Sequence, residues 1–371
     1  MDHCIQTRRR GGKILAKPVG AGTSLPAPAY GRVFSQALQS MEGRFEEAPE
    51  RGRRASYESS TFMSQTLARP GRPRAFFQLL KRLRLTLEMI KFEHSVFALP
   101  FALTGALLAF REEGFHVRSA AVTLVWIVVA MVAARSAAMA FNRLVDAGLD
   151  ARNPRTRMRH LPTGLLSRSF AWGFVAVSSA VFLFAAGRLN PLCLHLAPLA
   201  LAVVFCYSFT KRFTSFSHLV LGFSLGIAPA AAWIAVAGSL DPRILWLTAA
   251  VTFWTAGFDV IYACQDYEFD CAEALSSVPR LLGISGALWV SRFLHLLMVA
   301  CLLALVHALS LGALALAGVG AVAALLIYEH SLVHAHDLSR VDAAFFTMNG
   351  WVSVLFFIFW AADIFLRYSG V

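Results

Sequence analysis

The chain has 371 residues, of which 57% are hydrophobic and only 15% charged, and its mean hydropathy is +0.59. A soluble domain of this length cannot bury so much apolar surface, so the composition excludes an ordinary soluble protein and indicates a polytopic membrane protein. Most of the formal charge of +12 lies in residues 1–85, which hold 16 Lys and Arg against 6 Asp and Glu. No nucleic-acid-binding motif accompanies these basic residues, so we expect no nucleic-acid partner.

Residues 1–80 combine Arg, Gly, Pro, Ser and Gln with little apolar periodicity, which predicts a basic, disordered cytoplasmic tail. A targeting segment, or an over-long start with synthesis beginning at Met41 or Met63, are alternative interpretations of this region. Residues 81–371 are expected to form a single transmembrane domain.

Apolar segments long enough to cross a hydrocarbon core of ~30 Å recur from about residue 85 onward. They predict an all-α protein with about nine transmembrane helices. The predicted segments cover residues 86–110, 119–146, 169–187, 192–209, 217–237, 244–264, 285–307, 311–329 and 344–366.

The second predicted segment ends in an unusual polar cluster, Asn142-Arg-Leu-Val-Asp146-Ala-Gly-Leu-Asp150. Because a helix turns about 100° per residue, Asn142, Asp146 and Asp150 share one face that spans roughly 80°. Arg135 falls about 20° from Asn142 on the same face. It could pair with Asp146 or with a backbone carbonyl, or it could bind a substrate anion.

A second cluster ends the sixth segment, Asp259-Val-Ile-Tyr262-Ala-Cys-Gln-Asp266-Tyr-Glu-Phe-Asp270. On a continuous helix its four named residues would share an arc of about 80°. Uncompensated carboxylates near a bilayer cost several kcal/mol each, so such clusters indicate a functional site. Two facing rows of carboxylates could bind Mg²⁺ and, through it, a diphosphate.

The loops indicate which side of the membrane the clusters face. With the basic tail inside, the loops after the second, fourth, sixth and eighth segments also lie inside, and they hold nine Lys and Arg against five in the outside segments. This asymmetry satisfies the positive-inside rule. We therefore expect a protein of the bacterial inner membrane whose active site faces the cytoplasm.

The two clusters also carry a family resemblance. The sequence from Asn142 to Gly164 resembles the first aspartate-rich motif of the UbiA-type membrane aromatic prenyltransferases, and the sequence from Asp259 to Asp270 resembles the second. Supporting matches occur at 91–100, 207–213 and 337–346, and the resemblance extends over residues 85–366. The residue sequence of the second motif is similar to that of the bacterial 4-hydroxybenzoate polyprenyltransferase-like branch.

This resemblance implies a helical bundle around a central cavity, in which Mg²⁺ held by the two motifs binds the diphosphate of an isoprenyl donor. The implied metal ligands are Asn142, Asp146, Asp150, Asp259, Asp266 and Asp270. Of these, Asp146, Asp150, Asp259 and Asp266 are expected to be catalytic. The expected diphosphate contacts are Asn142, Lys211 and Tyr262, together with Arg155 and Arg159 on the inside loop after the first motif.

The chemistry of prenyl transfer explains why such residues are needed. Cleavage of an allylic C–O bond leaves a diphosphate anion and an allyl cation, which call for metal and basic groups and for a chamber without water. A phenolic ring then attacks through the carbon ortho to its hydroxyl, and Asp259 could assist removal of the phenol proton. Arg135 and His94 are candidate contacts of the aromatic acceptor, although His94 could instead be a packed interfacial residue.

The sequence therefore predicts Mg-dependent transfer of a polyprenyl group from polyprenyl diphosphate to a small aromatic acid, 4-hydroxybenzoate, in quinone biosynthesis. A dihydroxynaphthoate acceptor on a menaquinone route is the alternative within the family. An ion-coupled transporter is the alternative from another class, but it would need broken helices near the bilayer midplane. The expected partners are the two substrates and membrane lipid, and the oligomeric state is left open.

The loop after the second motif departs from the family pattern. The family continues with a glycine where this chain has Ala274, and the arginine of the pattern stands one place early, at Arg280. The departure leaves the expected metal ligands unchanged. It makes the shape of this loop, and any contact of Arg280 with the acceptor, open questions for the structure.

Overall fold

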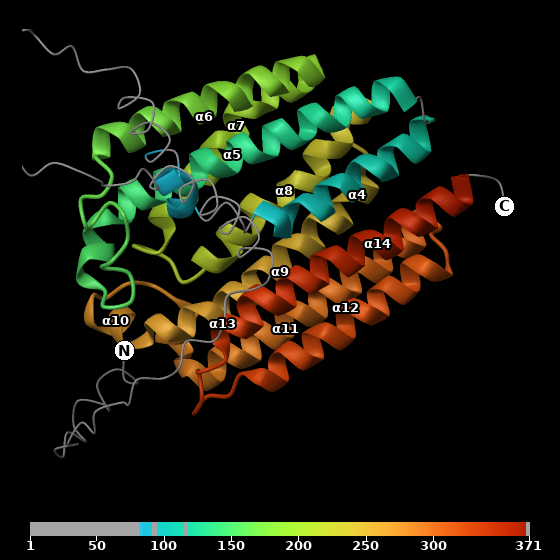
Figure 1. Ribbon diagram of the computed structural model, residues 1–371. Coiled ribbons are helices and arrows are strands. Elements are labelled where there is room, and N and C mark those ends of the chain that lie inside the picture. Colours follow the sequence, from blue (N-terminus) through green and yellow to red (C-terminus); the bar gives the residue numbers. More distant parts are fainter. Residues whose placement is uncertain (1–81, 83, 91–94, 115–116, 369–371) are drawn as a thin grey trace, which may run out of the picture. The chain divides into compact units, whose positions relative to one another are not determined.

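The computed structural model describes residue 82 and residues 84–90, 95–114 and 117–368, so the predicted tail at residues 1–80 lies outside the described residues. Within them the chain forms helices and no named β-strand, and nine of the helices have 19 or more residues (Figure 1). These long helices are α4 (Ser95–Glu113), α5 (Val117–Arg152), α6 (Arg168–Leu189), α7 (Pro191–Thr210), α8 (Ser217–Ala237), α9 (Leu245–Ala263), α11 (Val278–Ala308), α12 (Ala313–Leu332) and α14 (Asn349–Tyr368).

The nine long helices correspond in order to the nine predicted segments. Eight stretches of the described chain are long and apolar enough to cross a membrane by length and composition, and they overlap every long helix except α4. Some bounds differ from the prediction: α5 continues to Arg152 rather than ending near residue 146, and α11 begins at Val278 rather than near residue 285. The polytopic all-α prediction is therefore confirmed.

Six of the helices pack as a closed ring in the order α4, α8, α9, α11, α12 and α14, with α14 returning to α4. The centre of this ring is filled by large side chains that are fully buried, including Phe101, Trp254, Phe356 and Trp360. The Phe101 ring lies 4.9 Å from that of Trp254 and 4.6 Å from that of Phe356, between ring centroids. Aromatic pairs at such separations pack favourably, so these ring contacts stabilise the packing of α4 against α9 and α14.

The remaining long helices, α5, α6 and α7, pack on one another beside α8, as Figure 1 shows. Their boundaries follow from local sequence signals. Ser167 caps α6 by accepting a hydrogen bond from the Phe170 amide, and Asn190 caps α7 by accepting one from Cys193. Pro191 occupies the first position of α7, where its missing N–H costs nothing.

Glycines bring α8 unusually close to α9. A Cβ atom added at Gly222 would lie 2.2 Å from the Thr252 carbonyl oxygen, and one added at Gly226 would lie 2.2 Å from the Thr252 hydroxyl oxygen. Glycines spaced four residues apart fall on one helix face and let two backbones approach each other. The packing of α8 on α9 therefore depends on side chains being absent at these two positions.

Two helical segments are interrupted near the end of the bundle where α5 finishes. After α9, the chain tightens to a 3₁₀ turn at Cys264–Asp266 and then forms the short helix α10 (Tyr267–Ala272). Before α14, a short helix α13 (Val341–Ala343) runs into a π-helical stretch at Ala344–Met348. The expectation of one continuous helix through the second acidic cluster is therefore wrong beyond Ala263, where the change of pitch redirects Asp266 and Asp270.

Candidate active site

The two acidic clusters, more than a hundred residues apart in the sequence, meet at one end of the bundle. Asn153, just after α5, donates a 2.9 Å hydrogen bond to Oδ1 of Asp266. Arg155 forms a two-pronged contact with the same carboxylate, at 3.0 Å to Oδ1 and 2.5 Å to Oδ2. It also donates a 2.9 Å hydrogen bond to the Tyr262 hydroxyl. Burial acts to lower the pKa of Arg155, but the hydrogen bonds and charge of Asp266 outweigh it, and the pKa lies above its ordinary value.

The first cluster lies on an uninterrupted helix, so its side chains do share one face of α5. Asn142 donates a 3.0 Å hydrogen bond to Asp146, whose other oxygen lies 3.0 Å from the guanidinium of Arg212. Asp150 lies 2.6 Å from Arg159, which belongs to the loop that follows α5. Each carboxylate of this cluster therefore faces a basic side chain from a different segment.

The second cluster shows the same arrangement at its two remaining carboxylates. Asp270 is completely buried, and the ammonium of Lys211 lies 2.8 Å from its Oδ1. Asp259 accepts a 2.7 Å hydrogen bond from Nδ1 of His218, at the start of α8. The predicted carboxylates thus meet a set of basic groups that come from the α5 loop, the end of α7 and the first turn of α8.

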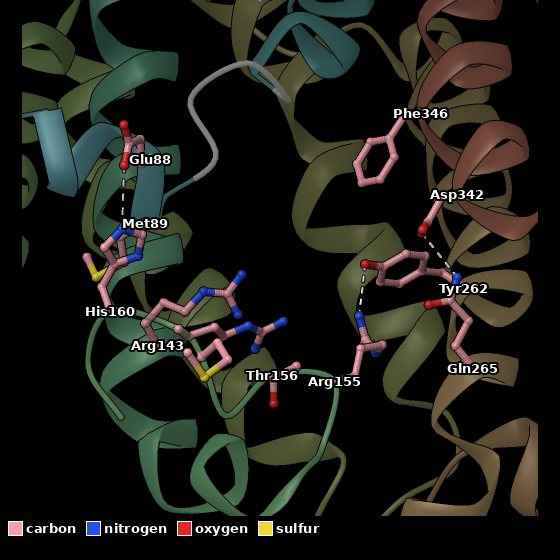
Figure 2. A pocket seen from close by; sticks show the side chains of 12 residues that line it. Glu88, Met89, Arg143, Arg155, Thr156, His160, Tyr262, Gln265, Asp342 and Phe346 are labelled. Atoms are coloured by element: carbon pink, nitrogen blue, oxygen red, sulfur yellow. Dashed lines mark hydrogen bonds and ion pairs between the residues drawn. The ribbon is translucent and has the colours of Figure 1, made fainter. Parts of the chain in front are cut away.

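A cavity of about 410 Å³ opens beside these ion pairs. Figure 2 shows Arg143, from α5, facing Arg155 and Tyr262 across it. The lining residues are Glu88, Met89, Arg143, Arg155, Thr156, Met158, Arg159, His160, Tyr262, Gln265, Asp342 and Phe346. Three arginines among twelve lining residues make this cavity suited to an anion.

Nine of the twelve lining residues were not candidate site residues in the sequence analysis, among them Arg143 and His160. Arg143 lines the cavity and forms no ion pair or hydrogen bond within the described part of the chain, whereas the other two lining arginines are paired with aspartates. His160 lies 3.6 Å from Glu88, which joins the loop after α5 to the helical turn before α4. The adjacency of Arg143 to Asn142 was the available signal for the first, but nothing in the sequence links His160 with Glu88.

Arg135 does not pair with Asp146, so that interpretation of its position is wrong, since Asp146 pairs with Arg212 instead. The Arg135 Nε atom is buried and has no hydrogen-bond partner among the described residues. A buried guanidinium nitrogen without a hydrogen-bond partner is costly, so the position of Arg135 suits an anionic ligand. The other candidate acceptor contact, His94, lies outside the described residues.

The loop after the second cluster explains the departure from the family pattern. Ala274 has a φ of 55°, in the left-handed region that favours glycine, so the chain keeps the glycine-like turn without the glycine. The Arg280 guanidinium donates a 2.9 Å hydrogen bond to the Leu275 carbonyl, and its amide donates to the Ser277 cap of α11. Arg280 therefore closes its own loop instead of reaching the cavity.

The fold and the sequence both match known proteins. The structure of a UbiA homolog from Aeropyrum pernix K1, without ligand, is 35% identical, covers 74% of this chain and 98% of its own, and superimposes with a TM-score of 0.65. A UbiA homolog from Archaeoglobus fulgidus, bound to GPP and Mg²⁺, shares the fold at 20% identity and a TM-score of 0.59, over 76% of this chain and 99% of its own.

Among curated proteins, the 4-hydroxybenzoate octaprenyltransferase of Vibrio atlanticus is 31% identical over 248 residues, which span 64% of this chain and 84% of that enzyme. The sequence model of the UbiA prenyltransferase family matches residues 98–367, which include every helix that contributes a carboxylate to the site. The chain is therefore a member of the UbiA prenyltransferase family.

Proposed function

We propose that this enzyme transfers a polyprenyl group from a polyprenyl diphosphate to a small aromatic acid, 4-hydroxybenzoate, in quinone biosynthesis. The observation that carries the proposal is the meeting of the two acidic clusters at one end of an apolar helix bundle, where basic side chains face each carboxylate. The names of the relatives, 4-hydroxybenzoate octaprenyltransferases, support the same acceptor.

The side chains of the two acidic clusters fit Mg²⁺, because carboxylate and amide oxygens are the ligands this hard cation prefers. The residues proposed to hold it are Asn142, Asp146, Asp150, Asp259, Asp266 and Asp270. In the described residues no three acidic, His or Cys side chains are grouped as a metal site, and each of these carboxylates is engaged with a basic group. Metal binding would therefore require these carboxylates to leave their basic partners and to bind the cation instead. When bound, the metal would supply positive charge against the diphosphate.

The basic side chains released by such an exchange are suited to the diphosphate itself. Lys211, Arg155 and Arg159 lie on the segments that surround the carboxylates, and the hydroxyl of Tyr262 is bound by Arg155. As the C–O bond of the donor breaks, negative charge grows on the leaving group, and guanidinium groups stabilise it in two-pronged geometry. Asn142 adds an amide to the same group of diphosphate contacts.

The acceptor side of the proposal depends on Arg135 and Asp259. Arg135 has a buried guanidinium nitrogen without a partner, which suits the carboxylate of an aromatic acid. Asp259 would accept the proton of the phenol hydroxyl and so raise the electron density of the ring carbon that attacks. His94 is the second proposed contact of the acceptor.

The apolar helices suit a long isoprenoid chain and a membrane location. The excess of Lys and Arg in the loops at the site end favours the cytoplasmic side of a bacterial inner membrane as the side that the site faces. Substrate entry from the cytoplasm and from the lipid would follow from that orientation.

The test uses the full chain in lipid nanodiscs with Mg²⁺, a polyprenyl diphosphate, and either 4-hydroxybenzoate or a dihydroxynaphthoate, with products identified by mass spectrometry. Prenylated 4-hydroxybenzoate is expected from the wild type, with a loss of at least about 100-fold in Asp146→Ala and Asp266→Ala. Glu113→Ala is the matched control, because it removes an exposed carboxylate at the C-terminal end of α4, and it should retain activity. Product formed only with the naphthoate would overturn the choice of acceptor, and product unaffected by both substitutions would overturn the site.

A further inference from the structure

His218 differs from the other basic partners of the acidic clusters. Four of the five cluster aspartates, at positions 146, 150, 266 and 270, face an Arg or Lys, whose charge is permanent. Asp259 instead faces an imidazole, with 2.7 Å between Oδ2 and Nδ1. His218 is 5% exposed, so its ring is held in a buried position against α9.

The contact made by Nε2 of His218 shows that Nδ1 is the donor to Asp259. The Val278 backbone amide donates a 3.3 Å hydrogen bond to Nε2 of His218. Since a backbone N–H can only donate, Nε2 must carry the lone pair, and the ring proton resides on Nδ1. His218 therefore donates a hydrogen bond from Nδ1 to Asp259, while the first turn of α11 holds the other edge of its ring.

We propose that His218 is a positioning residue for prenyl transfer, which fixes the orientation of the Asp259 carboxylate. This inference rests on the proposed function, in which Asp259 belongs to the reacting site. The contact with His218 engages the Oδ2 atom of Asp259, and within the described residues its Oδ1 atom accepts no hydrogen bond. A carboxylate fixed through one oxygen presents the other oxygen to the site in a defined direction.

The helix packing explains how the imidazole reaches Asp259. His218, Gly222 and Gly226 are spaced four residues apart, so they lie on the same face of α8. The two glycines let this face approach α9 so closely that an added Cβ atom would overlap Thr252. The close approach places the first turn of α8 against the last turns of α9, where Asp259 lies.

The experiment compares His218→Asn with His218→Leu in the full chain. The two side chains have nearly the same size, but only asparagine can donate a hydrogen bond from about the position of Nδ1. We expect His218→Leu to lower kcat by about 10- to 100-fold with little change in KM for the diphosphate, and His218→Asn to retain most of the activity. His295→Leu, which removes another buried histidine, is the control for a purely structural loss.

A second arm tests whether His218 acts through Asp259. In an Asp259→Asn background, His218→Leu should change kcat by less than about 2-fold, because the group it positions is already gone. A third arm needs no activity: ¹⁵N NMR of histidine-labelled protein, with the His218 signal identified from its loss in His218→Asn, should show a protonated Nδ1 that shifts in Asp259→Ala.

Equal losses in His218→Asn and His218→Leu, an undiminished effect in the Asp259→Asn background, or a protonated Nε2 would each overturn the inference. If His218→Leu does not fold, His218→Gln replaces it, since its longer amide reaches the Nε2 position and should not rescue kcat. A wild type that prenylates no aromatic acid would refute the proposed function instead, and the NMR arm would still decide the His218 tautomer.

Discussion

Replacement of Gly222 by alanine should separate α8 from α9 by a predictable amount. The new Cβ atom would lie 2.2 Å from the Thr252 carbonyl oxygen, whereas real Cβ contacts are essentially never shorter than 3.0 Å, so the helices must part by about 0.8 Å (3.0 − 2.2). The carbonyl belongs to the backbone of α9 and cannot rotate away. Overpacking of this kind costs about 1–3 kcal/mol.

Gly173→Ala in α6 is the matched control, because nothing lies within 4 Å of its added Cβ atom. Alanine is favoured over glycine in a helix by about 0.5–1 kcal/mol, so this variant should be slightly more stable than the wild type. Unfolding of both variants in detergent, followed by circular dichroism, should therefore place Gly222→Ala below the wild type and Gly173→Ala above it.

Gly222→Ala should also lower prenyl transfer, since Gly222 lies one helical turn from His218, whose ring meets Asp259 at 2.7 Å. A displacement approaching 1 Å at a catalytic group can cost about 100-fold in rate. Stability and activity of Gly222→Ala equal to those of Gly173→Ala would refute the reasoning, because they would show that α8 and α9 do not depend on this close contact.

Two further predictions concern the ends of the acidic clusters. A double-mutant cycle of Arg155→Ala and Asp266→Ala, followed by detergent unfolding, should give a coupling energy of about 2 kcal/mol, as expected for a charge-assisted, two-pronged contact. A coupling near zero would show that the loop after α5 is held by other contacts. Ala274→Gly should raise the unfolding free energy by about 0.5–1 kcal/mol, because it relieves a left-handed φ of 55°; an unchanged or lower stability would contradict the strain.

The sequence was sufficient for the number and order of the long helices and for the location of the two acidic clusters. Apolar length determines which segments can cross a bilayer, and helical periodicity determines that Asn142, Asp146 and Asp150 share one face of α5. Both kinds of inference depend only on residues close together in the chain, which is why they succeeded.

The partners of the carboxylates depended on the tertiary structure. Arg135 is the nearest arginine on the same helix face, yet Asp146 pairs with Arg212, which arrives from the end of α7. The change to 3₁₀ geometry at Cys264–Asp266 also altered the predicted arc of the second cluster, and Asp266 there accepts a hydrogen bond from Asn153 in the loop after α5. No periodicity in the sequence records either contact.

The role of His218 shows the same division most clearly. The sequence contains His218, Gly222 and Gly226 at helical spacing, but spacing alone does not say which helix their common face meets. That choice depends on how closely two backbones can approach, which is decided by the side chains of both helices together. Local sequence therefore determined the helices and their polar ends, and packing between distant segments determined which polar groups face one another.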